Sequence, residues 1–375
     1  MDLRLLFLLF VLSIQAFHIS AQERIHVNEF QKGNEHFDAG RHQEAVVAYT
    51  AALSLDSMMS EIYVNRGLAQ MELKNYRAAL KDFDQALLMD RSNKNNFKNR
   101  AVARLKLKQY PEALTDFNEA IALEPNDGAL YYERALYHVI AGESKNAIAD
   151  LNESIRLSPT AKALLERGKV KAKLNDMHGA ISDFTEAIAR NSKLTEAYFE
   201  RGSAYNDLGY GLEAEEDFTQ TVVLSPGKAD AFYNRALLKY ARNDANGSLQ
   251  DLNKFIALNK KRPEAYFNRG LAYKKLNKNT EALADLNKAI SLKPKQADFL
   301  RHRGEVKIAL KSFVEGEKDF THALSIQPKN AEAFLGRGYC RVMLKNKVGG
   351  CADLNKAYSL GAKQAAQLIN FNKCQ

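Results

Sequence analysis

The sequence contains no tryptophan, only seven prolines and only three cysteines among its 375 residues. Few helix breakers, together with a hydrophobic share of 46%, favour a folded, helix-rich protein and argue against a disordered one. The cysteines show no CxxC or Cys/His spacing, and the eight histidines show no ligand spacing. We therefore predict no metal site and no cofactor.

Recognisable catalytic motifs are also missing from the chain. There is no P-loop, GxSxG, HExxH or dinucleotide fingerprint, and no isolated acidic pair falls in a predicted cleft. We predict no catalytic residues and a protein that is not an enzyme. An enzyme whose chemistry lies on a scaffold is the alternative.

No apolar stretch approaches the roughly 20 residues that a membrane-spanning helix needs, so we predict no integral membrane span. The apolar run at residues 5–17 follows Arg4 and precedes the small residues Ser20 and Ala21, which is typical of a signal peptide. We predict a signal peptide at residues 1–21 and export to the periplasm or the exterior. The alternative is a buried N-terminal helix.

What the chain does contain is a period of 34 residues, with one interval of 33. The small residues that mark this period are Gly33, Gly67, Ala101, Ala135, Gly168, Gly202, Ala236, Gly270, Gly304 and Gly338. A second small residue follows each of them 12 residues later, for example Ala45 and Ala79. Small side chains let two helix axes approach closely, so each period is interpreted as a hairpin of two short antiparallel helices.

Larger residues complete the pattern. An aromatic residue or leucine lies four residues before most of the first small residues, and the second helix carries apolar residues at i, i+4 spacing, such as Phe83 and Leu87. Prolines such as Pro125 and Pro159 follow the second helices, as expected for a residue that cannot continue a helix.

This pattern resembles the tetratricopeptide repeat family over essentially all of residues 27–365. The resemblance implies an all-α, right-handed superhelical solenoid of about ten antiparallel helix-turn-helix repeats, and a protein-binding scaffold. We assign residues 22–365 to the array and residues 366–375 to a capping helix and tail, the last helix covering residues 365–371. The predicted repeats lie near residues 27–60, 61–94, 95–128, 129–161, 162–195, 196–229, 230–263, 264–297, 298–331 and 332–365.

A charge pair recurs with the same period. An arginine lies just before the small residue of nine repeats, and an aspartate follows it by 16 residues. We predict a ladder of structural, bidentate ion pairs; an anion-binding track is the alternative. Representative pairs are Arg66 with Asp82, Arg100 with Asp116, Arg201 with Asp217, and Arg269 with Asp285.

Solenoids of this family usually bind partners along a concave groove lined by the first helix of each repeat. We predict that a protein or peptide partner binds there; the alternative is that winding or the chain's own N-terminal residues cover the groove. The residues that the resemblance places in it are Phe30, Phe37, Leu68, Met71, Tyr132, Leu136, Val139, Phe199, Tyr233, Tyr240, Phe267, Leu271, Lys274 and Lys275.

One binding mode of the family is not expected. A known clamp for C-terminal carboxylates uses Lys, Asn and Arg on this face. Asn34 and Asn65 match two of its positions, but Phe30, Asn95 and Asn99 replace the cations. A carboxylate is therefore not well held.

Charge is unevenly distributed along the chain. Residues 230–375 carry a formal net charge of +14 and the whole chain +9, so residues 1–229 carry −5. The C-terminal half is therefore suited to an acidic partner or polymer. Binding of nucleic acid by the basic half is an alternative that the export signal and the apolar groove disfavour, and a passive spacer is another.

The cysteines allow one further prediction. Cys340 and Cys351 fall at facing positions of the last predicted hairpin, where an oxidising compartment would allow a disulfide. Two small buried thiols are the alternative.

Overall fold

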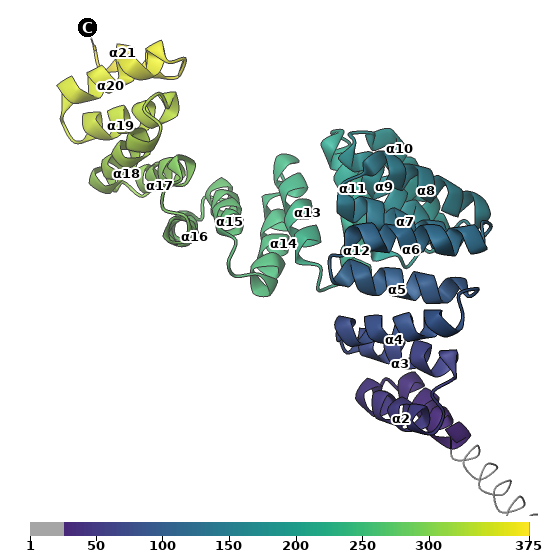
Figure 1. Ribbon diagram of the computed structural model, residues 1–375. Helices are drawn as coiled ribbons and strands as arrows, with labels where there is room; N and C mark the ends of the chain where they lie inside the picture. The colour runs from purple at the N-terminus through teal and green to yellow at the C-terminus, as the bar shows by residue number, and fades with distance from the viewer. Residues whose placement is uncertain (1–25, 375) are drawn as a thin grey trace, which may run out of the picture. The chain divides into compact units, whose positions relative to one another are not determined.

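The structure, a computed structural model, describes residues 26–374 (Figure 1). The predicted signal peptide therefore lies outside the described residues. Every regular element between residues 26 and 374 is a helix, and consecutive helices pair into hairpins. The predicted fold class, an all-α solenoid of helical hairpins, is confirmed. The chain divides into two compact units, unit 1 up to Arg190 and unit 2 from Asn191.

Unit 1 begins with a helix over residues 26–38, which pairs with α2. The remaining hairpins pair α3 with α4, α5 with α6, α7 with α8, and α9 with α10. The helices are α2 (His42–Leu55), α3 (Ser60–Glu72), α4 (Tyr76–Met89), α5 (Lys94–Lys106), α6 (Tyr110–Leu123), α7 (Gly128–Ala141), α8 (Ser144–Leu157), α9 (Ala161–Lys173) and α10 (Met177–Arg190).

Unit 2 repeats the same arrangement, with odd-numbered first helices and even-numbered second helices, and adds one short final helix. The helices are α11 (Thr195–Asp207), α12 (Gly211–Leu224), α13 (Ala229–Ala241), α14 (Ala245–Leu258), α15 (Pro263–Lys275), α16 (Asn279–Leu292), α17 (Ala297–Ala309), α18 (Phe313–Ile326), α19 (Ala331–Met343), α20 (Lys347–Ser359) and α21 (Ala365–Phe371).

The small residues of the 34-residue period make room for a large side chain of the second helix. A β-carbon added at Gly67 would lie 2.6 Å from a ring carbon of Phe83, which is itself fully buried. At Gly338 the added atom would lie 3.0 Å from Leu354 and 3.1 Å from the carbonyl oxygen of Gly350, the second small residue. The period thus sets how closely the two helices of each hairpin approach.

The turn inside each hairpin has its own local signature. One residue in each turn takes a positive φ, for example 61° at Lys74 and 66° at Asn175. The first helix therefore ends at a residue in the left-handed backbone conformation. The backbone amide of the next residue then returns to the helix: Asn75 N donates to Gln70 O at 2.8 Å. These turns reverse the chain so that the second helix packs on the first.

The last helix, α21, packs on α20 and closes the C-terminal end of unit 2. A disulfide joins Cys351 of α20 to Cys374, with α-carbons 5.2 Å apart. The predicted bond between Cys340 and Cys351 is therefore wrong. The sulfur of Cys340 lies against α18, where a β-carbon added at Gly316 would be 3.2 Å from it. Cys340 is a fully buried free thiol, and burial raises its pKa to about 12.

Candidate binding face and arginine ladder

The predicted Arg–Asp pairs are present as bidentate bonds. Arg66 Nε and Nη2 donate to the two carboxylate oxygens of Asp82 at 3.1 and 2.7 Å. The aspartates of the ladder are 1–6% exposed. The same geometry joins Arg100 to Asp116, Arg134 to Asp150, Arg167 to Asp183, Arg201 to Asp217, Arg235 to Asp251, Arg269 to Asp285, Arg303 to Asp319 and Arg337 to Asp353.

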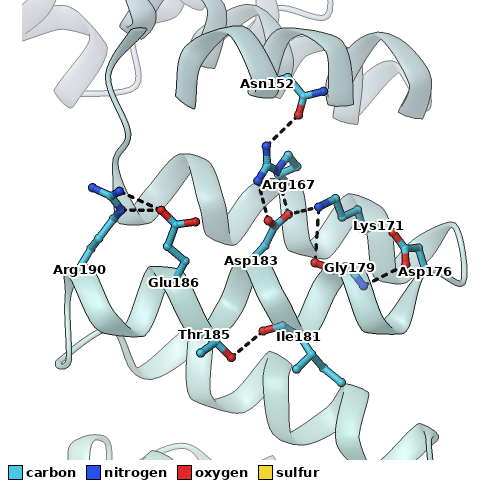
Figure 2. Close-up of polar contacts among 10 residues, drawn as sticks. All are labelled: Asn152, Arg167, Lys171, Asp176, Gly179, Ile181, Asp183, Thr185, Glu186 and Arg190. Atoms are coloured by element: carbon cyan, nitrogen blue, oxygen red, sulfur yellow. Dashed lines mark hydrogen bonds and ion pairs between the residues drawn. The ribbon is translucent and has the colours of Figure 1, made fainter. Parts of the chain in front are cut away.

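The remaining guanidinium nitrogen often reaches the neighbouring hairpin. Figure 2 shows Arg167, whose Nη1 donates to Asn152 Oδ1 of α8 at 2.9 Å while its other nitrogens bind Asp183. Lys171, one turn further along α9, adds a second cation 2.8 Å from Asp183. The arginine thus connects the two helices of its own hairpin and also bonds to the preceding hairpin.

Most ladder arginines also lie over an aromatic ring. The guanidinium carbon of Arg66 is 5.6 Å from the centre of the Tyr63 ring, and that of Arg269 is 5.7 Å from Tyr266. Burial raises the pKa values of Asp82 and Asp217 although each accepts two bonds from arginine. Desolvation therefore offsets much of the attraction, and the ladder contributes more to register than to stability.

The second feature is the surface formed by the first helices of successive hairpins, which we call the first-helix face. In unit 1 it is formed by residues 26–38 and by α3, α5, α7 and α9, with α3 and α5 in direct contact. The side chains that the sequence places on it are half-buried, so part of their apolar surface stays accessible. These are Phe30, Phe37, Leu68, Met71, Tyr132, Leu136 and Val139.

A hollow of about 310 Å³ opens in this face between the first two hairpins of unit 1. The residues that line it are Asn34, Phe37, Asp38, Tyr49, Asn65 and Leu68. Two hydrogen bonds order its floor: Tyr49 Oη donates to Asn34 Oδ1 at 2.8 Å, and Asn65 Nδ2 donates to the same oxygen at 3.1 Å. Asn34 and Asn65 are the two residues that match the family's clamp.

The electrostatic character of the hollow is acidic. Burial and the nearby charges of Asp38 and Glu61 raise the pKa of Tyr49 to about 12, against a smaller opposing contribution from the Asn65 bond. Tyr49 is therefore a neutral donor at physiological pH. Among residues 26–374, no basic group lies within ion-pair distance of Asp38 or Glu61.

Sequence reasoning did not single out Asp38 or Tyr49. The signal for Asp38 is present, because Asn34 and Asp38 are spaced i, i+4 and so share a helix face. The role of Tyr49 is harder to foresee, because its ring is a core element that is 1% exposed and only its hydroxyl reaches the hollow.

The first-helix face of unit 2 is formed by α11, α13, α15, α17 and α19. Phe199, Tyr240, Phe267 and Leu271 are half-buried there. Tyr233 is predicted to line the groove, but in the structure it is buried, with only 6% of its surface exposed. The guanidinium carbon of Arg262 lies 3.8 Å from its ring centre, and Asn268 Nδ2 donates to its hydroxyl at 2.9 Å.

The two lysines predicted for the groove are both engaged within unit 2. Lys274 pairs with Glu305 of α17, which also contacts Arg301 and His302. Lys275 Nζ donates to Asn243 Oδ1 at 2.6 Å and lies 4.6 Å from the centre of the Tyr240 ring. Burial by itself would raise the pKa of Glu305, but His302 and Lys274 outweigh it and lower the pKa to about 2.

Two further features are absent from the described part of the chain, a metal-binding cluster and a membrane-spanning helix. No group of three or more His, Cys, Asp or Glu side chains there is arranged to hold a metal ion. Between residues 26 and 374, no helix is both long enough and apolar enough to span a membrane.

Comparisons with known proteins agree with this architecture. A family model described as tetratricopeptide repeat matches residues 60–93, 97–127 and 263–296, and one described as TPR repeat matches residues 33–74. A comparison with curated proteins gave no match.

Several solved structures are similar. The C-terminal part of a TPR repeat-containing protein from Cytophaga hutchinsonii is 19% identical, with a TM-score of 0.53 over 63% of this chain and 97% of that one. A tetratricopeptide repeat protein from Parabacteroides merdae is 20% identical, with a TM-score of 0.46 over 66% and 99%. YrrB, described as a TPR protein with an unusual peptide-binding site, is 23% identical, with a TM-score of 0.43 over 49% and 95%. At such identities the likeness concerns the fold alone.

Proposed function

We propose that the chain is a non-catalytic scaffold of the tetratricopeptide repeat type, and that its first-helix face in unit 1 binds a segment of a protein partner. The family models that match residues 33–74, 60–93, 97–127 and 263–296 support this proposal. The observation that carries this proposal is the hollow between its first two hairpins. It combines an apolar wall with hydrogen-bonding groups that face an open volume. Such a combination is the usual composition of a specific binding site.

The amides of the hollow offer what a peptide backbone requires. Asn34 Oδ1 is already bound by Tyr49 and Asn65. Within the described residues, the Nδ2 group of Asn34 and the Oδ1 atom of Asn65 have no hydrogen-bond partner. One donor and one acceptor thus remain for a ligand, while Phe37 and Leu68 supply apolar contact.

The polar groups of the hollow are suited to binding rather than to chemistry. A phenol with a pKa of about 12 remains protonated at neutral pH and acts as a donor. The neighbouring amides do not titrate. The site therefore supports recognition.

The test is selection of a random peptide library on the immobilised full chain, followed by affinity measurement with purified variants. Leu68→Lys places a positive charge in the apolar wall of the hollow and should weaken binding at least tenfold, about 1.4 kcal/mol. Leu271→Lys is the matched control, because each leucine directly follows the small residue of its hairpin, Gly67 and Gly270. Selected peptides that bind both variants as they bind the wild type would contradict the proposal.

A second candidate function rests on the charge of unit 2. Lys260, Lys261 and Lys295 are exposed, and no carboxylate of residues 26–374 lies within ion-pair distance of them. We propose that an acidic protein or polymer is attracted to this side. Labelled polyglutamate should bind the wild type in low salt and bind Lys260→Glu/Lys261→Glu more weakly. Equal binding by the wild type and the variant would exclude Lys260 and Lys261 as the binding site for the polymer.

We also propose that the protein is exported. The apolar run at residues 5–17 supports this, and so does the disulfide between Cys351 and Cys374, because such bonds persist mainly in oxidising compartments. Cell fractionation with N-terminal sequencing is the test. A mature chain that starts near Gln22 outside the cytoplasm is the expected result, and an unprocessed cytoplasmic chain would contradict it.

A further inference from the structure

The hollow of unit 1 contains the chemical groups that bind a cation, and no basic side chain of residues 26–374 lines it. Asp38 supplies a carboxylate, Asn65 an amide oxygen, Phe37 a ring, and Tyr49 a hydroxyl group. One edge of Phe37 contacts His42, with ring centres 5.3 Å apart. No lysine or arginine of the described chain lies over the ring of Phe37.

In unit 2, the same kinds of group bind cationic side chains of the protein itself. Arg262 places its guanidinium over Tyr233, and its Nη1 donates to Asp230 Oδ1 at 3.2 Å. Lys275 combines the Tyr240 ring with the amide oxygen of Asn243. A ring next to a carboxylate or amide oxygen thus holds a cation of the chain itself in unit 2.

The surroundings of the hollow strengthen this contrast. The first helices of the first two hairpins carry Lys32 and Arg66, and these are paired with Glu29 and Asp82. Asp38 and Glu61 are left with no basic partner in the described region, and both act on the buried hydroxyl of Tyr49. A cation entering the hollow would therefore meet uncompensated negative charge in a partly desolvated site.

We propose that the hollow of unit 1 binds a basic side chain, arginine in preference to lysine, from a segment of the partner protein. This inference rests on the proposed function and names the chemistry of the ligand. A planar guanidinium stacks on Phe37 and donates to both Asp38 and Asn65 Oδ1, whereas an ammonium group makes a less directional contact. The hollow, at about 310 Å³, is large enough to admit one such side chain.

The experiment uses ¹⁵N-labelled full chain and three capped pentapeptides, with arginine, citrulline or glutamate between alanines. Citrulline keeps the shape of arginine without its charge. The side-chain amide signals of Asn34 and Asn65, assigned through Asn34→Asp and Asn65→Asp, report on the hollow. The arginine peptide should shift both signals saturably, the citrulline peptide should bind about tenfold more weakly, and the glutamate peptide should cause no shift.

Asp38→Asn should remove the preference for arginine over citrulline. Asp207→Asn is the matched control at the equivalent position of unit 2, the last residue of α11, and should leave the preference unchanged. Equal binding of arginine and citrulline by the wild type would overturn the inference. So would display-selected peptides that lack basic residues but lose binding with Leu68→Lys, a result that leaves the proposed function intact.

Discussion

Unit 1 and unit 2 use equivalent asparagines in different ways. Asn65 and Asn268 each lie two residues before the small residue of their hairpins. Asn65 donates to Asn34 beside an open hollow, whereas Asn268 donates to Tyr233 beneath Arg262. The framework of small residues, rings and Arg–Asp pairs is common to both units. The first-helix face is therefore free to differ, open and acidic in one unit and filled by its own cations in the other.

The largest expected effect comes from the ladder, whose aspartates bind one cation at some positions and two at others in both units. Asp116 in unit 1 accepts bonds from Arg100 and Arg104, whereas Asp217 in unit 2 accepts its bidentate pair of bonds from Arg201. Asp116→Ala should lower stability by about 3–5 kcal/mol, because two guanidinium groups lose a buried partner. Asp217→Ala should cost less. Thermal and urea melts measure both, and an unchanged melting temperature for either variant would contradict a structural role.

The next largest effect on stability is expected from the disulfide at the C-terminal end of unit 2. The disulfide closes 23 residues of sequence at the end of unit 2, so its loss should cost about 2–4 kcal/mol. Cys374→Ser should match the reduced wild type in stability, and reductant should not destabilise it further. Alkylation of the denatured, non-reduced protein should modify Cys340 alone. A modified Cys374 would refute the bond.

Two carboxylates on the first-helix faces should respond oppositely to pH. The pKa of Glu305 in unit 2 is lowered from its ordinary 4.5 to about 2, so its stabilisation is present above about pH 4.5 and is lost as the pH falls toward 2. In unit 1, burial raises the pKa of Glu133 against the charges of Lys98, Lys106 and Lys162. Its contribution is therefore present at low pH and is lost as the pH rises through the raised pKa.

Substitution by glutamine separates the two cases. At pH 7, Glu305→Gln should destabilise by about 1–3 kcal/mol, because charged partners are left unpaired. Glu133→Gln should stabilise by about 0.5 kcal/mol. Melting curves from pH 3 to pH 8 provide the comparison, and shifts of the same sign at pH 7 would contradict the assigned environments.

The smallest effect is at Arg262. Arg262→Ala removes a cation from the Tyr233 ring and should cost about 0.5–1 kcal/mol. It should also open a site in unit 2, so the arginine peptide should gain a second, weak binding event. Calorimetric titration against the wild type is the check. Unchanged stability together with a single binding event would show that Arg262 does not fill the face.

The sequence was enough to predict features that depend on residue positions within one hairpin. The Arg–Asp pairs are separated by 16 residues on two helices joined by a short turn, so the period alone places them together. The final helix, α21, spans Ala365–Phe371, where the sequence predicts one. These features depend on helix geometry and close approach at small residues.

Features that depend on two hairpins were not foreseen. Lys274 meets Glu305 and Lys275 meets Asn243 across 31 and 32 residues of sequence. Such contacts require the packing angle between hairpins and the rotamers of long side chains, which the repeat pattern does not specify. The partner of Cys351 was wrongly predicted for a related reason, because the direction of the Cys340 side chain decides it.

The most direct test of the account is hydrogen exchange of the full chain with and without a display-selected peptide. We expect slower exchange in residues 26–38 and in α3, no change in α13 and α15, and loss of the effect in Leu68→Lys but not in Leu271→Lys. Protection confined to unit 2, or protection that survives Leu68→Lys, would contradict the central claim that the hollow of unit 1 is the partner-binding site.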